Sequence, residues 1–429
     1  MPPSKTPELQ AANTVVVGDF VGSWGDLLAC ARKSTAARLL EEPGRVAVVV
    51  DGDLQVLQLL SLCSVSRTAD LLVLPESRLT EGVMATVASH GFALTRFDGS
   101  VLREPAATLP VRQGSITLLT SGSTGTPKLV AHTFDTLFTA ARARRIEPSV
   151  WLVPYQTGTY AWFQLVTKGM FSPGQNLVFS MSHEPSVVFA AATQHAVTSI
   201  SATPTFWRLA MLQMEPEALS AVPLRQIALG GEVSDQSILD HLAALYPSAD
   251  ISHVYASTEV GACIVVKDRK EGFPASILER RDGLSPEIRV REGRLEVRSP
   301  FAAQSGVTAA EAGWIDTGDV VEFRGDRVHF CGRADTAMIN VGGNKAFPAD
   351  VEAVIQKHPA VAWSRVRARK APLVGHLAEA DVVLRPGHSA VDEASLTQHC
   401  AARVPEYAVP RFWNFLSAIP VQGSLKSSL

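Results

Sequence analysis

The sequence is sparing with cysteine, and the placement of its cysteines excludes several classes of protein. Its 429 residues contain only Cys30, Cys63, Cys263, Cys331 and Cys400, and no two of them form a CxxC pair. An odd number of scattered cysteines argues against a disulfide framework and against a zinc site, and it favours a reducing compartment. We therefore expect a cytoplasmic protein without structural disulfides.

Long apolar runs and an excess of one charge are also missing. No stretch reaches the roughly 18 uninterrupted apolar residues that a membrane-spanning helix needs. The opening residues, MPPSKTPELQ, carry no apolar signal core. The formal net charge is −3, from 39 basic and 42 acidic residues, and no basic block is visible. We expect neither a membrane span nor a nucleic-acid partner.

What the sequence does have is a regular alternation of helix-like and strand-like segments over its first 275 residues or so. Residues 23–40 predict an amphipathic helix, residues 45–53 (RVAVVVDGD) a strand and turn, and residues 54–65 another helix. Such alternation predicts an α/β fold in which helices cover parallel sheets.

The pattern changes after residue 275. Residues 287–300 and 319–333 alternate apolar with charged residues, which is typical of antiparallel strands with one solvent-facing side. A small α+β unit follows Gly332. We expect a large N-terminal domain over residues 1–333, with a small β-barrel-like part at its end, and a small C-terminal domain over residues 334–429.

The run TSGSTGTPK, residues 120–128, follows a predicted strand and has the composition of an anion-binding loop. Its glycines permit close backbone approach, its hydroxyls are hydrogen-bond donors, and Lys128 adds a positive charge. It is not a Walker A loop, because Pro127 precedes the lysine and no Ser or Thr follows it. By itself the run fits a mobile surface turn equally well.

Five further signatures follow in a fixed order. They are LGGE (229–232), VYASTE (254–259), WIDTGD (314–319), GRADTAMINVGGNKAFPADVE (332–352) and PVQGSLK (420–426). Together with the 120–128 run they resemble the adenylate-forming superfamily of acyl- and aryl-CoA ligases, peptide-synthetase adenylation domains and luciferases. The resemblance covers nearly the whole chain and is strongest to aryl and acyl ligases of the benzoate–CoA ligase type.

The resemblance implies an ATP-dependent acid–thiol ligase. Such an enzyme converts a carboxylic acid to acyl-AMP with release of pyrophosphate, and then transfers the acyl group to the thiol of CoA. The implied cofactors are ATP, Mg²⁺ and CoA, and the small domain is expected to move between the two steps. Transfer to the phosphopantetheine of an acyl carrier protein, a non-catalytic nucleotide-binding relative, and a homodimer remain open.

For the nucleotide, the resemblance implies a set of residues from five of the signatures. The residues expected to bind the phosphates are Thr120, Ser121, Gly122, Ser123, Thr124, Gly125, Lys128 and Thr258. Tyr255 is expected to stack on adenine beside Gly231 and Glu232, Glu259 to hold Mg²⁺, Asp319 to bind the ribose, and Arg333 to reach ribose and phosphates. Each also has an ordinary structural reading, such as a helix cap for Thr258 and Glu259 or a hairpin turn for Asp319.

For the small domain, the resemblance implies a hinge at Asp335, a catalytic lysine at Lys426, and a pantetheine tunnel lined by Gly342 and Gly343. Leu425 replaces the glycine that usually precedes the lysine. The segment after Lys426 is shorter than usual in the family. The segment before Thr120 is also shorter than usual, which leaves room for altered substrate access or a partner.

The acid pocket is expected around Tyr155, Thr157, Gly158, Gly230 and Ala256. No aspartate lies between residues 150 and 168 to pair with an amino group, and an unpaired buried ammonium is costly. A flat, mostly apolar slot fits an aryl or short acyl acid better than an α-amino acid.

Overall fold

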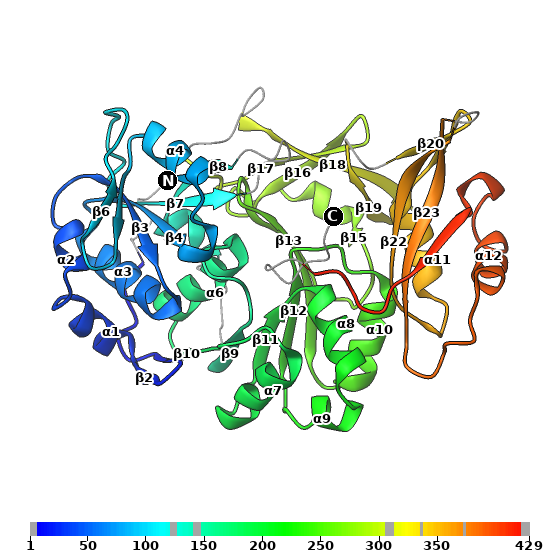
Figure 1. Ribbon diagram of the computed structural model, residues 1–429, viewed down its shortest axis with the longest axis horizontal. Coiled ribbons are helices and arrows are strands. Elements are labelled where there is room, and N and C mark those ends of the chain that lie inside the picture. The colour runs from blue at the N-terminus through cyan, green and yellow to red at the C-terminus, as the bar shows by residue number, and fades with distance from the viewer. Residues whose placement is uncertain are drawn as a thin grey trace.

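The computed structural model describes residues 7–120, 127–139, 147–304, 313–334, 338–371 and 375–421. Its strands form four sheets, called A to D below. In Figure 1, sheet B lies on the left, most of sheet A in the lower centre, sheet C along the top and sheet D on the right. Among the described residues, no helix is long and apolar enough to cross a membrane.

Sheet B uses the N-terminal part of the chain and is mainly parallel. Its strands, in spatial order, are β6 (Val101–Arg103), β5 (Ala93–Arg96), β3 (Arg45–Val50), β4 (Asp70–Pro75), β7 (Ser115–Thr120) and β8 (Lys128–Thr133). The edge strands β6 and β8 are antiparallel to their neighbours. Its helices are α1 (Trp24–Ala31), α2 (Ala36–Leu39), α3 (Asp53–Ser66), α4 (Glu81–Ser89) and α5 (Phe134–Leu137).

The single helix expected over residues 23–40 is wrong, because the structure has two helices there. The chain turns between α1 and α2, where the Ser34 hydroxyl donates to the Ala31 carbonyl at 2.7 Å. Ser and Thr compete in this way with the helical hydrogen-bond pattern, and consecutive Ser34 and Thr35 therefore favour a break.

Sheet A contains eight strands and forms the centre of the molecule. In spatial order they are β14 (Gly261–Val266), β13 (Asp250–Ser257), β12 (Gln226–Gly230), β11 (Ser199–Ala202), β9 (Ser149–Val153), β10 (Gln175–Phe179), β1 (Thr14–Val17) and β2 (Phe20–Ser23). The six inner strands are parallel. Its helices are α6 (Tyr160–Phe171), α7 (Pro185–Gln194), α8 (Pro204–Gln213), α9 (Pro216–Ser220) and α10 (Gln236–Leu245).

The two faces of sheet A differ in composition. One face carries Leu152, Ile200, Ile227 and other apolar residues that pack against α7, α8 and α10. The opposite face is apolar at β1, β9 and β10, where it packs against α6 and the helices of sheet B. Over β11, β12 and β13 this second face changes to small and polar residues, so the apolar core ends there.

Sheets C and D account for the rest. Sheet C is antiparallel and contains β15 (Phe273–Pro274), β19 (Arg327–Arg333), β18 (Ile315–Arg324), β17 (Arg294–Arg298) and β16 (Glu287–Arg291). Sheet D contains β21 (Asn344–Ala346), β20 (Ile339–Val341), β23 (Gly375–Leu384), β22 (Val361–Ala371) and β24 (Phe412–Phe415), with α11 (Pro348–Gln356) and α12 (Glu393–Ala401). The C-terminal unit has its own apolar core, which includes Ile355, Val382 and Leu396.

Candidate nucleotide- and acid-binding site

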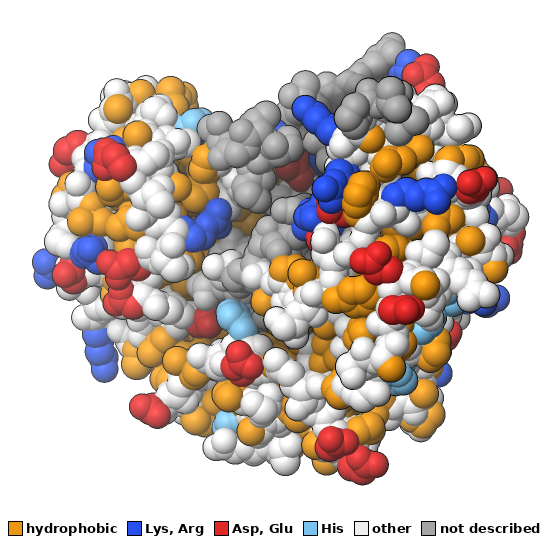
Figure 2. Space-filling view, turned by 45° about the vertical axis from the view of Figure 1, so that its right-hand side comes forward, with side chains coloured by type: hydrophobic (Ala, Val, Ile, Leu, Met, Phe, Trp, Pro, Cys, Tyr) orange, Lys and Arg blue, Asp and Glu red, His pale blue; other side chains and the backbone are white. Residues whose placement is uncertain are grey.

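Three sheets meet where the parallel strands of sheet A end. Open α/β sheets place their ligands at the carboxyl ends of parallel strands, so this edge is the natural position for a site. Sheet B reaches it through β8, since His132 Nε2 lies 2.6 Å from the Thr258 carbonyl oxygen. Sheet C reaches it through Asp319 on β18, which accepts a hydrogen bond from the Tyr255 hydroxyl. Figure 2 shows that this face of the molecule is hollowed between two lobes, with Lys and Arg side chains on both sides of the hollow.

Tyr255, Asp319 and Arg333 form a connected cluster. Arg333 Nη1 lies 3.3 Å from Asp319 Oδ1 and donates to the Thr317 carbonyl at 2.5 Å. The Tyr255 ring stacks on Phe330, with ring centroids 4.8 Å apart. Burial, with the Asp319 charge in second place, raises the pKa of Tyr255, so its hydroxyl stays a donor. The structure therefore joins three residues that the sequence assigns to one nucleotide.

A glycine at position 318 allows this cluster to close. Gly318 has a φ of +78°, and a Cβ added there would lie 2.9 Å from Arg333 Nη2. A side chain would thus meet both backbone strain and a clash with the guanidinium. The glycine of the IDTGD signature has a local reason to be there.

Thr258 and Glu259 follow β13 and are held by their backbone. The buried His132 donates from Nε2 to the Thr258 carbonyl, and the Glu259 carbonyl accepts from the Ala303 amide at 2.9 Å. Burial lowers the pKa of His132 to about 4, so the ring is neutral at physiological pH. The Glu259 carboxylate makes no hydrogen bond or ion pair with another described residue. It is available to a ligand.

His132 was not singled out by the sequence analysis. It occupies an ordinary strand position, and neither its spacing nor its neighbours mark it. The only available signal was a histidine in the apolar strand LVAHT, directly after the predicted phosphate loop.

The two ends of the predicted phosphate loop are defined by strand pairing. Thr120 ends β7 and Lys128 begins β8; they are register partners, and the Thr120 hydroxyl donates to the Lys128 carbonyl at 3.4 Å. The Lys128 side chain is exposed. Ser121, Gly122, Ser123, Thr124 and Gly125 lie outside the described residues, as do Asp335 and Lys426.

The GGE turn contacts a helix as well as the site. Gly231 has a φ of +85°, which favours glycine. The Glu232 carboxylate accepts from both the amide and the hydroxyl of Thr205, each at 3.0 Å, in the first turn of α8. Glu232 thus satisfies one helix-terminal amide, a structural role that its place in the signature did not suggest.

The acid end of the site contains Tyr155, Ser201 and Gly230. The Tyr155 hydroxyl lies 3.1 Å from Ser201 Oγ, and a Cβ on Gly230 would lie 3.6 Å from that hydroxyl. Burial raises the pKa of Tyr155 to about 12. Ala256 lies on β13 next to a bulge that follows Tyr255. These residues share one edge of sheet A.

Thr157 contacts Asp53, a residue that the sequence analysis missed. Asp53, at the start of α3, accepts from the Thr157 hydroxyl at 2.7 Å and from Trp162 Nε1 at 2.8 Å, both at its Oδ1 atom. Burial raises its pKa. A carboxylate therefore does lie beside the predicted acid residues, but it comes from a segment about 100 residues earlier. Gly158, with a φ of +79°, packs nearby on Pro75.

Gly342 and Gly343 lie apart from these residues. They form the exposed turn between β20 and β21, at the upper right of Figure 1, and a Cβ on Gly343 would meet nothing within 4 Å.

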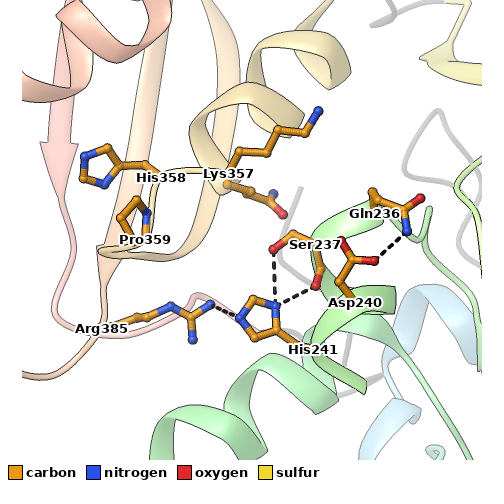
Figure 3. Close-up of a pocket in the computed structure, with 9 residues that line it drawn as sticks. Gln236, Ser237, Asp240, His241, Lys357, His358, Pro359 and Arg385 are labelled. Atoms are coloured by element: carbon orange, nitrogen blue, oxygen red, sulfur yellow. Dashed lines mark hydrogen bonds between the residues drawn. The ribbon is translucent and has the colours of Figure 1, made fainter. Parts of the chain in front are cut away.

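A cavity of about 230 Å³ lies at a different place, between α10 and the C-terminal unit. Figure 3 shows His241 between Ser237 and Arg385, with Arg385 Nη2 3.2 Å from His241 Nε2. Asp240 is bound by Gln236 at 2.8 Å. None of the residues predicted for nucleotide or acid lines this cavity.

Comparison with known proteins agrees with the fold and the signatures. The family described as AMP-binding enzyme matches residues 31–281, and the family described as AMP-binding enzyme C-terminal domain matches residues 350–426. The chain belongs to the AMP-binding enzymes. The predicted superfamily and the α/β fold are confirmed.

Curated relatives include 2-succinylbenzoate–CoA ligases. That of Bacillus velezensis is 27% identical over 352 residues, covering 75% of this chain and 69% of the relative. That of Bacillus subtilis is also 27% identical, covering 72% and 66%. A 4-coumarate–CoA ligase-like protein of Oryza sativa subsp. japonica is 24% identical, covering 76% and 63%. The matched part thus spans about two thirds of these relatives.

Solved structures share the fold over almost the whole chain. An anthranilate CoA ligase in complex with anthranoyl-AMP matches with a TM-score of 0.75 and 16% identity, covering 98% of this chain and 93% of its own. The O-succinylbenzoate coenzyme A synthetase of Bacillus subtilis, in complex with ATP and magnesium ion, matches with a TM-score of 0.72 and 20% identity, covering 99% and 96%.

Proposed function

We propose that the protein is an AMP-forming acid–CoA ligase. It activates a small carboxylic acid, of the aryl or short acyl type, as acyl-AMP with release of pyrophosphate, and then transfers the acyl group to the thiol of CoA in the cytoplasm. The observation that carries the proposal is the Tyr255–Asp319–Arg333 cluster at the carboxyl edge of sheet A, where His132 of β8, the strand after the 120–128 loop, contacts Thr258. The named ligases among the relatives support it.

In this proposal the cluster binds the nucleoside part of ATP. Asp319 accepts from the ribose hydroxyls, since a carboxylate only accepts. Arg333 lies beside it and reaches ribose and phosphate, while Tyr255 offers a ring against adenine next to Gly231. Thr120, Lys128, Thr258 and the residues of the 121–126 loop bind the phosphates.

Mg²⁺ fits a single protein ligand here. The described residues contain no group of three or more His, Cys, Asp or Glu side chains that could form a metal cage. Mg²⁺ in nucleotide sites is commonly held by one or two carboxylates, water and the phosphates themselves. The Glu259 carboxylate meets that need, and the cation would offset the charge that builds on the phosphates.

The small domain, taken as residues 334–429 against a larger domain of residues 1–333, supplies the rest in this proposal. Lys426 bridges the substrate carboxylate and the α-phosphate, and it stabilises the transition-state charge. Rotation about Asp335 then brings the Gly342–Gly343 turn to line the pantetheine path.

The experiment is acid-dependent ATP–pyrophosphate exchange over a panel of aryl, acyl and amino acids, followed by addition of CoA or a carrier protein. We expect exchange with aryl or short acyl acids and thioester formation with CoA. Lys426→Ala is expected to slow exchange by about 10²- to 10³-fold. Lys370→Ala, at an exposed position on β22 of the same C-terminal unit, serves as the matched control.

Three other outcomes would each contradict one part of the proposal. Absence of exchange with every acid would favour a non-catalytic nucleotide-binding protein. Thioester formation only with a carrier protein would replace CoA as the acceptor. Exchange at the wild-type rate in Lys426→Ala would remove the lysine from its role.

A further inference from the structure

Lys168 is a largely buried lysine outside the nucleotide site. It lies near the end of α6, and its Nζ sits 3.7 Å from the centroid of the Trp151 ring on β9. Among the described residues its ammonium has no hydrogen-bond or ion-pair partner. A ring face compensates a cation only in part, by about 0.5–2 kcal/mol. A buried ammonium with no other partner is energetically costly, because no hydrogen bond or opposite charge compensates its lost hydration.

The positive charge of Lys267 makes the charged form of Lys168 less favourable. Burial and the like charge of Lys267 lower the pKa of Lys168 to about 7. Lys267 and Arg269 line a cavity of about 120 Å³ together with Trp151, Ala228 and Ser252. The carboxylate of the exposed Asp250 also lines it, so the cavity lining holds two basic side chains and one carboxylate.

Strand register connects this region with the acid end of the site. Trp151 pairs with Ser199, and Ser199 with Gln226, so their side chains lie in one row across sheet A. Two residues further along, Ser201 pairs with Ala228 and Ala228 with Ser252 in a second row on the same face.

The following row on this face holds Gly230 and Val254, beside Tyr155, whose hydroxyl contacts both Ser201 and the space next to Gly230. Ser201, Ala228 and Gly230 form a strip of small residues on this face, between the acid end and the row that contains Trp151. Four residues along a strand span roughly 13 Å.

One buried hydroxyl in this strip also has no partner. Ser199 is fully buried, and its Oγ makes no hydrogen bond with another described residue. Buried polar atoms are normally satisfied, and those left over often mark the place of a ligand or water. The unsatisfied hydroxyl, on β11, and the unpaired ammonium, on α6, both lie beside Trp151.

We propose that the acid substrate carries a second anionic group, a carboxylate, at the end remote from the one that is activated, and that Lys168 binds it. The strip of small residues holds the body of the acid, and its distal carboxylate lies over Trp151 within reach of Lys168. Lys267 adds charge at the mouth of the neighbouring cavity. This inference rests on the proposed function and specifies its substrate class.

The test compares acids in pairs that differ by the distal carboxylate. Benzoate and 2-succinylbenzoate are the first pair, and a monocarboxylic acid with its dicarboxylic counterpart is the second. We expect the wild type to have the higher kcat/KM for the member with two carboxylates. Lys168→Met should raise KM for that member by about tenfold or more, as expected for loss of a charge-assisted hydrogen bond, and change KM for the monocarboxylate by no more than about twofold.

Three further variants sharpen the result. Lys168→Arg keeps the charge and should restore part of the preference, whereas loss of packing alone would not be rescued. Lys270→Met, at an exposed lysine that does not line the cavity, should leave the preference unchanged. If Lys168→Met fails to fold, Lys267→Met tests the same charge excess from an exposed position.

A readout without catalysis separates this inference from the proposed function. Amine labelling of Lys168, followed by peptide mass spectrometry, should be slowed by 2-succinylbenzoate but not by benzoate, in the absence of ATP. Labelling that is unaffected by both acids, together with equal KM ratios in wild type and Lys168→Met, would overturn the inference while leaving the ligase intact. Absence of exchange with every acid would instead count against the ligase itself.

Discussion

The nucleotide end and the acid end of the site are built in different ways. At the nucleotide end, Tyr255, Asp319 and Arg333 come from strands β13, β18 and β19, and they hold one another through hydrogen bonds. At the acid end, Asp53 and Lys168 come from helices α3 and α6; Asp53 is held by Thr157 and Trp162, whereas Lys168 contacts only the ring of Trp151. In the proposed function the first end binds the same nucleotide for every acid, and the second leaves one charge for the substrate to pair with.

Among the variants that test this difference between the two ends, we expect the largest loss of activity from Asp319→Ala. It removes the acceptor of both Tyr255 and Arg333, and each hydrogen bond to a charged group contributes about 1.5–3 kcal/mol. We expect exchange to fall by about 10²-fold or more, mainly through a higher KM for ATP. Asp326→Ala, at the exposed tip of the same hairpin, is the matched control. An unchanged KM for ATP would place the nucleotide elsewhere.

His132→Gln tests whether the nucleotide end depends on a neutral histidine. The folded protein holds His132 at a pKa of about 4, below the ordinary value of 6.5. Between these values the unfolded chain binds the proton and the folded chain does not, so the free energy of unfolding falls as pH decreases through this window. The variant should lose about 1–3 kcal/mol of that pH-dependent change.

The measurement is urea unfolding at several pH values across the window. The exposed His90 is the control, since His90→Gln should retain the full slope. Equal slopes in the His132→Gln and wild-type proteins would show that His132 titrates normally.

Asp53→Ala tests the acid end, with a smaller expected effect. It removes the acceptor of Thr157 and Trp162, and we expect KM for the acid to rise about tenfold while KM for ATP stays within about twofold. Asp53→Asn keeps an acceptor oxygen and should retain more activity. Asp51→Ala, two residues earlier and exposed, is the control. Equal changes in both KM values would mean that Asp53 supports the site as a whole.

The smallest effect is expected from Tyr155→Phe. It removes one neutral hydrogen bond, to Ser201, which corresponds to about 0.5–1.5 kcal/mol and a change of a few fold in KM for the acid. Tyr246→Phe removes a comparable hydrogen bond, to the Leu219 carbonyl, far from the site. It should change stability without changing KM, and a Tyr155→Phe variant that behaves in the same way would exclude Tyr155 from the pocket.

The sequence allowed the nucleotide end to be predicted because its residues sit in short signatures with local causes. Gly318 and Asp319 are an example, since the turn that needs the glycine also presents the carboxylate. The acid end could be predicted only in part. Asp53 and Thr157 are about 100 residues apart, and nothing in the run DGDLQ shows that α3 begins beside α6.

Burial was the other property that sequence did not supply. His132 and Lys168 occur in ordinary strand and helix patterns, and their altered pKa values come from helices and strands packed around them. The role of Glu232 at α8 was hidden for the same reason: its partner Thr205 belongs to another element.

That hydrogen-bonded pair of Glu232 and Thr205 has an engineering consequence. Helix α8, which Glu232 caps, places Leu209 and Leu212 against Trp363 of the C-terminal unit. Helix α8 therefore connects the turn at Gly231 with the surface on which the C-terminal unit packs. A redesign of this turn for another nucleotide would have to preserve the Glu232 carboxylate, because its loss would also change the packing of the C-terminal unit on α8.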